Sequence, residues 1–303
     1  MKGTPNLYKK MKKPIKSLKL WEEAKKIIPG GSQLLSKRAE MFLPGQWPAY
    51  FSKAKGVFVW DLDGNKYMDT LGSIGASILG YADKDVDSAV KKAIATSVVS
   101  SLNAPEEVEL AKLLIKLHPW AKKVRYARTG GEAMAVAVRI ARAFSGKDKI
   151  AFCGYHGWHD WYLASNLASD KNLDGHLLPG LKPAGVPRAL AGTALPFHYN
   201  RIEELEKIMA ENKDVGVIVM EPARNHEPKD HFLQKVREIA NKYKAVLVFD
   251  EITIGWRLVA GGAHMKFGVN PDIAVFAKAV SNGYPMAAII GTSDVMEACQ
   301  VRS

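Results

Sequence analysis

A lysine and an aspartate, each directly after an apolar run, are the residues of this chain whose types and spacing best suit covalent chemistry. Asp250 ends the run at residues 246–249, and Lys278 follows the run at residues 272–276, 28 positions after the aspartate. Short apolar runs of this kind predict buried strands. We therefore expect the two side chains to emerge at the ends of neighbouring strands of one sheet.

A lysine and a carboxylate placed in this way can hold pyridoxal 5'-phosphate (PLP). The amine forms a Schiff base with the aldehyde of the cofactor, and the carboxylate keeps its ring nitrogen protonated. The apolar surroundings at residues 275–280 would lower the pKa of the Lys278 amine by desolvation and make it available as nucleophile and base. Other roles stay open at this point: Lys278 could reach water, and Asp250 could cap a helix or bind a metal ion.

A candidate phosphate site lies between a predicted strand and a predicted helix. Thr129, Gly130 and Gly131 would offer a hydroxyl group and backbone amides at the positive end of the helix dipole. The same residues also fit a plain helix N-cap, with Glu132 behind it.

Further candidates follow two other predicted strands. Tyr155 and His156 come after the strand at residues 149–153, where an aromatic ring could stack on a planar cofactor or simply lie on a surface loop. Glu221 ends the run at residues 215–220, at the sheet edge where open α/β sheets bind ligands. It would position cofactor or substrate, or cap a turn.

The pattern from residue 123 onward predicts the α/β class. Val- and Ile-rich strands alternate with helices, which favours a mainly parallel central sheet with helices on both faces. The predicted elements are strands at 123–128, 149–153, 215–220 and 245–249, and helices at 129–144, 202–211 and 232–243. Residues 168–192 are too long for an ordinary connection and predict a functional loop or lid.

The first part of the chain is predicted to be organised differently. Helical spacing is found at 20–28, 84–96 and 106–117, a hairpin with a turn at 63–65 is predicted at 56–69, and residues 71–80 are predicted to be loop. These patterns suggest a basic arm and helix at 1–30, an N-terminal segment with the hairpin at 31–80, and a large cofactor-binding domain at 81–303.

Composition excludes several classes of protein. The 303 residues are 47% hydrophobic and 24% charged, which is ordinary for a soluble globular protein. No apolar run is long enough to suggest a membrane span, and no signal peptide is recognisable. Cys153 and Cys299 are too few for a disulfide framework, so we expect a cytoplasmic protein. No His, Cys, Asp and Glu cluster has metal-ligand spacing, so no metal site is predicted.

The net charge of +12 is concentrated in the N-terminal arm. Residues 1–30 hold nine lysines and two glutamates, with a basic run at 9–13. Such an arm could contact nucleic acid, but no aromatic-interleaved basic stripe continues into the body of the chain. We expect a solvated extension and no nucleic-acid partner.

Taken together and in this order, these segments resemble the class III aminotransferases of PLP fold type I, and are most similar to the branch of the glutamate-1-semialdehyde 2,1-aminomutases. The similarity runs from about residue 29 to residue 291. It includes the motifs at 56–69, 78–80, 129–133, 155–157, 221–222 and 250–252, and Lys278.

The resemblance implies roles for the candidate residues. Lys278 would carry the internal aldimine, and Asp250 would pair with the ring nitrogen. Ile252 and Tyr155 would pack on opposite faces of the ring. The expected cofactor contacts are Thr129, Gly130, Gly131, Tyr155, His156, Glu221, Asp250, Ile252 and Lys278.

The chain also departs from the pattern of the family. The family usually has Ser-Gly-Thr in place of residues 129–131, and Gln or Met in place of Thr253, where the usual contact to the ring hydroxyl of the cofactor is made. The chain ends at Ser303, whereas the family continues into a small C-terminal domain. This sequence therefore looks like a C-terminally incomplete member, with the small domain largely absent.

The resemblance implies a PLP-dependent aminotransferase that acts on a small-molecule amino donor and a carbonyl acceptor, as a homodimer. An aminomutase, which returns the nitrogen to the same molecule, is the alternative, since residues 180–187 resemble the mobile loop of that enzyme. A third hypothesis is a non-catalytic fragment or a binding module. Candidates for binding a substrate carboxylate are Arg38, Arg224 and Arg257.

Overall fold

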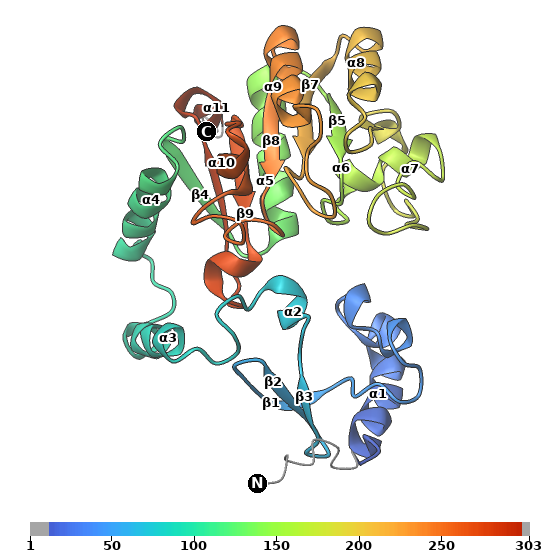
Figure 1. The fold of residues 1–303 in the computed structure, drawn as a ribbon, viewed down its shortest axis with the longest axis vertical. Coiled ribbons are helices and arrows are strands. Elements are labelled where there is room, and N and C mark those ends of the chain that lie inside the picture. The colour runs from blue at the N-terminus through green and yellow to red at the C-terminus, as the bar shows by residue number, and fades with distance from the viewer. Residues whose placement is uncertain (1–11, 299–303) are drawn as a thin grey trace, which may run out of the picture. The chain divides into compact units, whose positions relative to one another are not determined.

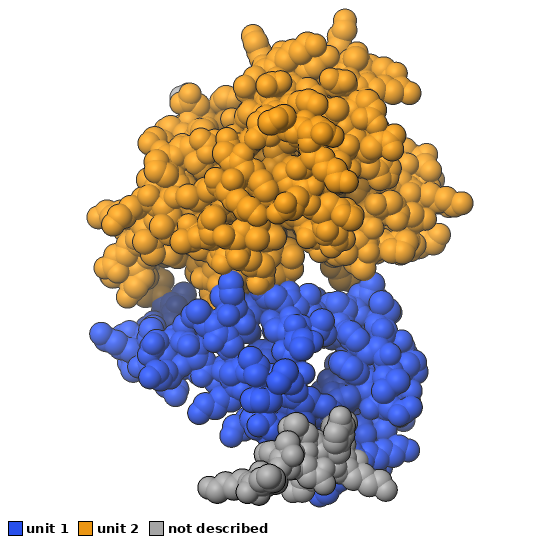
Figure 2. Space-filling model, viewed as in Figure 1, with its two compact units in different colours: residues 1–99 blue, residues 100–303 orange. Residues whose placement is uncertain are grey.

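The computed structural model describes residues 12–298 and forms two compact units, residues 1–99 and 100–303 (Figure 2). Each unit has its own sheet. The predicted boundaries at residues 30 and 80 stay predictions. Most of the predicted basic run at 9–13, and Cys299, lie outside the described residues.

The first unit contains a three-stranded antiparallel sheet in the order β1-β2-β3 (Figure 1). The Asp61 carboxylate closes the β2–β3 turn, because it accepts hydrogen bonds from the backbone N–H groups of Asp63 (2.9 Å) and Asn65 (2.8 Å) and from the Tyr67 hydroxyl group (2.8 Å). The predicted hairpin is therefore confirmed. The elements are α1 (Ile15–Ile27), β1 (Phe51–Lys55), β2 (Phe58–Asp61), β3 (Lys66–Met68), α2 (Gly72–Gly75), α3 (Lys84–Thr96), and three short 3-10 turns at Pro29–Gly31, Leu35–Lys37 and Ala39–Met41.

The larger unit is built on a seven-stranded sheet in the order β4-β10-β9-β8-β7-β5-β6. β10 is antiparallel to both of its neighbours, and the other strands run in one direction. The strands are β4 (Lys123–Ala127), β5 (Lys149–Cys153), β6 (Ala194–Pro196), β7 (Val215–Met220), β8 (Val246–Asp250), β9 (Ile273–Phe276) and β10 (Ala287–Gly291). The predicted mainly parallel sheet is confirmed.

Helices cover both faces of this sheet (Figure 1). Alternate residues of β7 point to opposite sides: Val217 and Val219 pack in the cluster around α5, whereas Ile218 and Met220 pack with α8 and α9. The helices are α4 (Pro105–Leu117), α5 (Gly130–Ser145), α6 (Asp160–Leu163), α7 (Ser165–Ala168), α8 (Ile202–Glu211), α9 (Phe232–Tyr243), α10 (Ala263–Phe267) and α11 (Ser293–Glu297), with 3-10 turns at Arg188–Leu190 and Lys278–Ser281.

The long connection between α7 and β6 is attached to the core. Leu173 is fully buried and Val186 is 7% exposed, and both pack in the α5 cluster. The Asn166 side chain accepts a hydrogen bond from the Leu173 N–H (3.0 Å) and donates one to the Leu181 carbonyl (2.6 Å). Leu173 and Val186 thus anchor this connection to the core at two positions. Its role as a lid stays a prediction.

Within residues 12–298, no helix is long and apolar enough to cross a lipid bilayer.

Candidate functional site

The predicted site residues meet at one edge of the large sheet. Because β4, β5, β7, β8 and β9 run in the same direction, their carboxyl ends share that edge. The structure places Thr129 after β4, Tyr155 and His156 after β5, Glu221 after β7, Asp250 at the end of β8 and Lys278 after β9.

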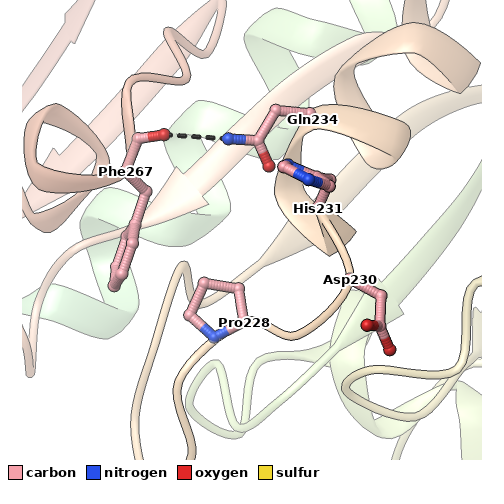
Figure 3. Close-up of a pocket in the computed structure, with 5 residues that line it drawn as sticks. All are labelled: Pro228, Asp230, His231, Gln234 and Phe267. Carbon is pink, nitrogen blue, oxygen red and sulfur yellow. Dashed lines mark hydrogen bonds between the residues drawn. The ribbon is translucent and has the colours of Figure 1, made fainter.

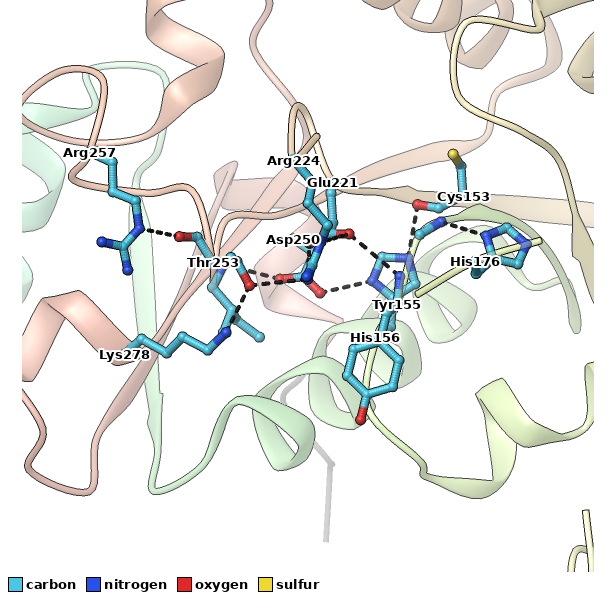
Figure 4. Close-up of polar contacts among 12 residues, drawn as sticks. Cys153, Tyr155, His156, His176, Glu221, Arg224, Asp250, Thr253, Arg257 and Lys278 are labelled. Atoms are coloured by element: carbon cyan, nitrogen blue, oxygen red, sulfur yellow. Dashed lines mark hydrogen bonds and ion pairs between the residues drawn. The ribbon is translucent and has the colours of Figure 1, made fainter. Parts of the chain in front are cut away.

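Asp250 and His156 form a buried pair. The Nδ1 atom of His156 lies 2.8 Å from Oδ2 of Asp250, and the two residues are 2% and 3% exposed, respectively. The second carboxylate oxygen of Asp250 accepts a hydrogen bond from the Ile252 N–H (3.0 Å), and Nε2 of His156 lies 3.1 Å from the Cys153 carbonyl oxygen. Figure 4 shows His156 held between these two acceptors. His156, expected among the cofactor contacts, therefore contacts the carboxylate.

Lys278 belongs to a polar chain that runs back to Glu221 (Figure 4). Its Nζ donates to Oγ1 of Thr253 (2.9 Å), which also accepts a hydrogen bond from Nη2 of Arg224 (3.2 Å). Nε of Arg224 lies 2.8 Å from each carboxylate oxygen of Glu221. A single hydroxyl group thus joins the lysine to an ion pair between half-buried Arg224 and buried Glu221.

The environment of Lys278 suits a nucleophilic amine. Burial, and then the positive charge of Arg224, lower the pKa of the Lys278 amine below its usual value. The lysine has a φ of +50°, a left-handed conformation that costs a non-glycine residue free energy.

Thr129 caps the N-terminus of α5. A helix N-cap was the alternative to a phosphate site for residues 129–131. Its hydroxyl group accepts a hydrogen bond from the Glu132 N–H (3.2 Å), and the Glu132 carboxylate accepts one from the Arg128 N–H (2.9 Å). A cap does not exclude an anion site, because the first backbone amides of the 16-residue helix have no partners within it.

Gly130 lies at a close approach between α5 and the residues that follow β8 and β9. A Cβ atom at Gly130 would lie 2.9 Å from Cδ1 of Ile252 and 3.5 Å from Cβ of Ala277. A side chain at residue 130 would therefore require the Ile252 side chain or the start of α5 to move.

Tyr155 is half-buried beside these groups. Its ring packs edge-to-face on Tyr162, with centroids 5.9 Å apart and an angle of 87° between the planes, and its N–H lies 3.5 Å from Oε2 of Glu221. Burial raises the pKa of the Tyr155 hydroxyl group, which keeps the side chain neutral. Tyr155 and Ile252 pack against the same apolar cluster, so both offer apolar surface at this edge.

Sequence reasoning missed a further buried carboxylate, Glu251. It is fully buried and accepts hydrogen bonds from the Ala263 and His264 N–H groups (both 2.9 Å) and from Nδ1 of His264 (2.8 Å). The Trp120 indole donates to Nε2 of the same histidine (2.9 Å), which fixes the histidine as the neutral form protonated on Nδ1. Glu251 therefore holds α10 in place and is not aimed at the cofactor edge.

Cavities of the larger unit lie both at this site and away from it. One of about 200 Å³ adjoins the candidate site and is lined by residues that include Tyr155, His176, Glu221 and Arg224. Another, of about 400 Å³, contains none of the predicted site residues; it is lined by Pro228, Asp230, His231, Gln234 and Phe267 (Figure 3). In the described part of the chain, no three His, Cys, Asp or Glu side chains are grouped as metal ligands.

Comparison with known proteins identifies the family. Residues 44–303 match the family model of class-III aminotransferases. The chain belongs to the class-III aminotransferases. It is 38% identical over 290 residues to a 3-aminobutyryl-CoA aminotransferase of Cloacimonas acidaminovorans, and 36% identical over 285 residues to a glutamate-1-semialdehyde 2,1-aminomutase of Nitrosopumilus maritimus. These alignments cover 93% and 92% of this chain, and 66% and 65% of the relatives. The chain thus spans about two thirds of the length of these relatives.

Solved structures confirm the fold of a class-III aminotransferase. An omega-transaminase from Sphaerobacter thermophilus superimposes with a TM-score of 0.82 and 29% sequence identity, over 96% of this chain and 66% of that chain. A transaminase with PLP bound superimposes with a TM-score of 0.83 and 26% identity, over 94% of this chain and 66% of that chain. The family is PLP-dependent.

The residues present in this chain fit PLP. An amine with a lowered pKa, a buried carboxylate and a helix N-terminus are the three groups that an aldehyde, a pyridine nitrogen and a phosphate require. All three are found at the same sheet edge.

Proposed function

We propose that this chain holds PLP and transfers an amino group from a small-molecule donor to a carbonyl acceptor. One observation carries the proposal: Asp250 ends β8 as a buried carboxylate, and Lys278 follows the adjacent parallel strand β9 as an amine of lowered pKa.

Each residue of the site has a role in this proposal. Lys278 would hold the cofactor, and its freed Nζ would take a proton from the substrate carbon and return it. Asp250 would keep the pyridine nitrogen protonated. The contact from Nδ1 of His156 would fix the orientation of the Asp250 carboxylate. PLP supplies an electron sink for the negative charge left when that proton departs.

The remaining contacts surround the cofactor. Tyr155 and Ile252 would cover opposite faces of its ring, since both expose part of an apolar side chain at the site. The backbone amides at Thr129, Gly130 and Gly131 would bind the phosphate, and Glu221 would act through Arg224.

Intramolecular amino transfer is the second candidate function. Relatives named glutamate-1-semialdehyde 2,1-aminomutase are 35% and 36% identical to this chain, close to the 38% of the 3-aminobutyryl-CoA aminotransferase. An aminomutase would convert a single amino aldehyde without an added acceptor, whereas an aminotransferase needs both partners, so product analysis with and without acceptor separates the two.

We also propose that the chain acts as a homodimer. Apolar side chains are exposed on the surface of the larger unit at Leu102 (82%), Val108 (56%) and Leu113 (51%), and on the surface of the first unit at Ile94 (59%) and Val98 (80%). A second copy of the chain that packs on these side chains would remove them from water. Sedimentation of the purified chain would test the proposal.

A cytoplasmic location is proposed on the chemistry of the described cysteine. Cys153 is a buried free thiol, which fits a reducing compartment.

The test of the cofactor proposal is spectroscopic. The purified chain should gain a visible absorbance band with PLP, and borohydride should fix the cofactor to a peptide that contains Lys278. Lys278→Ala should show neither the band nor the labelled peptide, while keeping the circular dichroism spectrum of the parent. Labelling of other lysines only would show that Lys278 does not hold the cofactor.

A further inference from the structure

We infer that His159 binds the phosphate group of PLP, as a side-chain donor beside the backbone amides at the start of α5. The inference rests on the proposed function and deepens it. His159 is not among the expected cofactor contacts, which include its neighbour His156. It takes a place that residue 131 leaves open, because this chain has a glycine there where the family usually has threonine.

The imidazole of His159 lies against the first turn of α5. A Cβ atom at Gly131 would lie 2.9 Å from Nε2 of His159 and 3.2 Å from its Cδ2. A Cβ atom at Gly157 would lie 3.5 Å from Cα of Gly131. With glycine at both positions, the segment after β5 lies on the start of α5, and Nε2 occupies the space beside Cα of Gly131.

The first turn of α5 has backbone donors at this place. The N–H of Glu132 is bound by Oγ1 of Thr129 (3.2 Å), and the N–H of Ala133 by the Thr129 carbonyl (3.0 Å). Among residues 12–298, the N–H groups of Gly130 and Gly131 have no acceptor. These two groups lie at the positive end of the helix dipole, where a bound anion is stabilised.

A phosphate group has more acceptor oxygens than these two amides can satisfy, and it is close to doubly charged at neutral pH. Residues 130 and 131 bring no side chain, so side-chain donors other than the Thr129 hydroxyl group must come from another element. The His159 ring is exposed to solvent and has no hydrogen-bond partner in the described part of the chain. Its Nε2–H group therefore donates a charge-assisted hydrogen bond to a phosphate oxygen at the start of α5.

The backbone of His159 is anchored although its ring is exposed. Its carbonyl oxygen accepts hydrogen bonds from the N–H groups of Tyr162 (3.0 Å) and Leu163 (3.1 Å), because His159 is the N-cap residue of α6. Tyr162 and Leu163 are buried in the core cluster around α5. The ring is thus attached to the same core as the helix whose first turn it contacts.

The experiment compares two ligands that differ only in the phosphate group. Pyridoxamine 5'-phosphate and pyridoxamine both lack the aldehyde, so neither reacts with Lys278. Calorimetry measures the dissociation constant of the first ligand directly and that of the second by competition with the first. Each protein is checked for folding by circular dichroism.

The variants separate the donor from the shape of the ring. His159→Ala and His159→Phe remove the donor, and His159→Gln keeps one close to the position of Nε2. A double variant combines Gly131→Thr with His159→Ala and places a hydroxyl group in the space that the imidazole leaves. Trp158→Ala is the matched control, because it removes a side chain that is 70% exposed from the same segment.

His159→Ala and His159→Phe should bind pyridoxamine 5'-phosphate about tenfold or more weakly than the parent, as expected when a hydrogen bond to a charged group is lost. Their affinity for pyridoxamine should stay within about twofold of the parent, because that ligand has no phosphate group. His159→Gln should lose less than His159→Ala, and the double variant should regain part of the loss. Trp158→Ala should keep the parent's ratio of the two dissociation constants.

The outcomes separate this inference from the proposed function. The inference is overturned if the donor-free variants weaken both ligands equally or weaken neither, or if Trp158→Ala changes the ratio as much as His159→Ala does. The proposed function still stands in these cases if the parent chain captures PLP on Lys278. A parent chain that binds neither ligand and captures no PLP overturns both. If His159→Ala does not fold, His159→Phe provides the same comparison.

Discussion

The imidazole Nδ1 of His156 lies 2.8 Å from the Asp250 carboxylate, and both residues are almost completely buried. A buried carboxylate is stable only if its oxygens have hydrogen-bond donors, and Asp250 obtains one from a backbone amide and one from this histidine. The histidine therefore decides the direction in which the carboxylate points, and with it the strength of the contact to the pyridine nitrogen.

Replacing His156 tests this dependence. His156→Leu should weaken PLP binding by about tenfold or more, since a hydrogen bond to a charged group contributes about 1.5–3 kcal/mol. His156→Asn should bind PLP nearly as well as the parent, because its amide nitrogen can donate from the position of Nδ1. Titration of PLP by absorbance measures both. Equal losses in the two variants would mean that the packing of the ring matters and the donor does not.

The glycine at the start of α5 makes a second prediction. Gly130→Ala places a methyl group 2.9 Å from Cδ1 of Ile252, so the Ile252 side chain or the helix start must shift. We expect a loss of about 1–3 kcal/mol in the free energy of unfolding by urea, together with weaker PLP binding.

A second substitution should rescue this loss. In Gly130→Ala combined with Ile252→Val, the atom nearest to the new methyl group is absent, so much of the stability should return. Gly146→Ala serves as a contrast, because residue 146 meets no atom within 4 Å and has a φ of +65°, so any loss there comes from the backbone conformation. If the double variant is no more stable than Gly130→Ala alone, the contact with Ile252 is not the cause of the lost stability.

The sequence predicted the strands that carry the site because each is a short apolar run that ends at a chemically distinctive residue. The helices at 84–96, 202–211 and 232–243 were predicted with the bounds found in the structure, since their apolar residues recur at helical spacing. Strand β6 was missed. It is three residues long and ends in Pro196, which is tolerated only because β6 is at the sheet edge.

The site shows where such reasoning stops. Lys278 and Asp250 could be found from the runs before them, but the link through Thr253 and Arg224 joins residues 25 and 29 positions apart in contacts that no periodicity encodes. The same applies to Glu251, whose partners at Ala263 and His264 follow an irregular loop. The order of the strands brings these side chains together.

Lys278 should make the cofactor-free chain less stable at neutral pH. Burial lowers the pKa of its amine in the folded chain, whereas the unfolded chain has the usual value of 10.5. Below 10.5 the unfolded chain therefore binds more protons at this residue, and the free energy of unfolding falls as the pH decreases toward the folded-state pKa. Lys278→Met should be more stable than the parent near pH 7, by about 1.4 kcal/mol for each unit of pKa difference.

Urea denaturation between pH 7 and 11 without PLP measures this difference. It should shrink as the pH rises and disappear above the pKa of the unfolded lysine. Lys266→Met, at a position 42% exposed on its side chain, is the control for the replacement of a surface lysine by methionine. A parent chain that is more stable than Lys278→Met at pH 7 would show that the hydrogen bond to Thr253 outweighs the cost of burial.

His176 should make the fold sensitive to mild acid. Its Nδ1 accepts a hydrogen bond from the Gly154 N–H (3.2 Å), its ring stacks on that of His198 with centroids 5.7 Å apart, and burial lowers its pKa from 6.5 to about 4. Above pH 6.5 the histidine is neutral in both the folded and the unfolded chain, so its ionisation does not change the free energy of unfolding. As the pH falls from 6.5 to 4, the imidazole of His176 binds a proton in the unfolded chain but not in the folded chain. The free energy of unfolding therefore falls by up to about 3 kcal/mol over this range.

Replacing His176 tests this prediction. His176→Asn keeps an acceptor for Gly154 and cannot titrate, so its urea midpoint should change less between pH 7 and 4 than that of the parent. Parallel pH profiles for the two proteins would show that other groups cause the acid sensitivity.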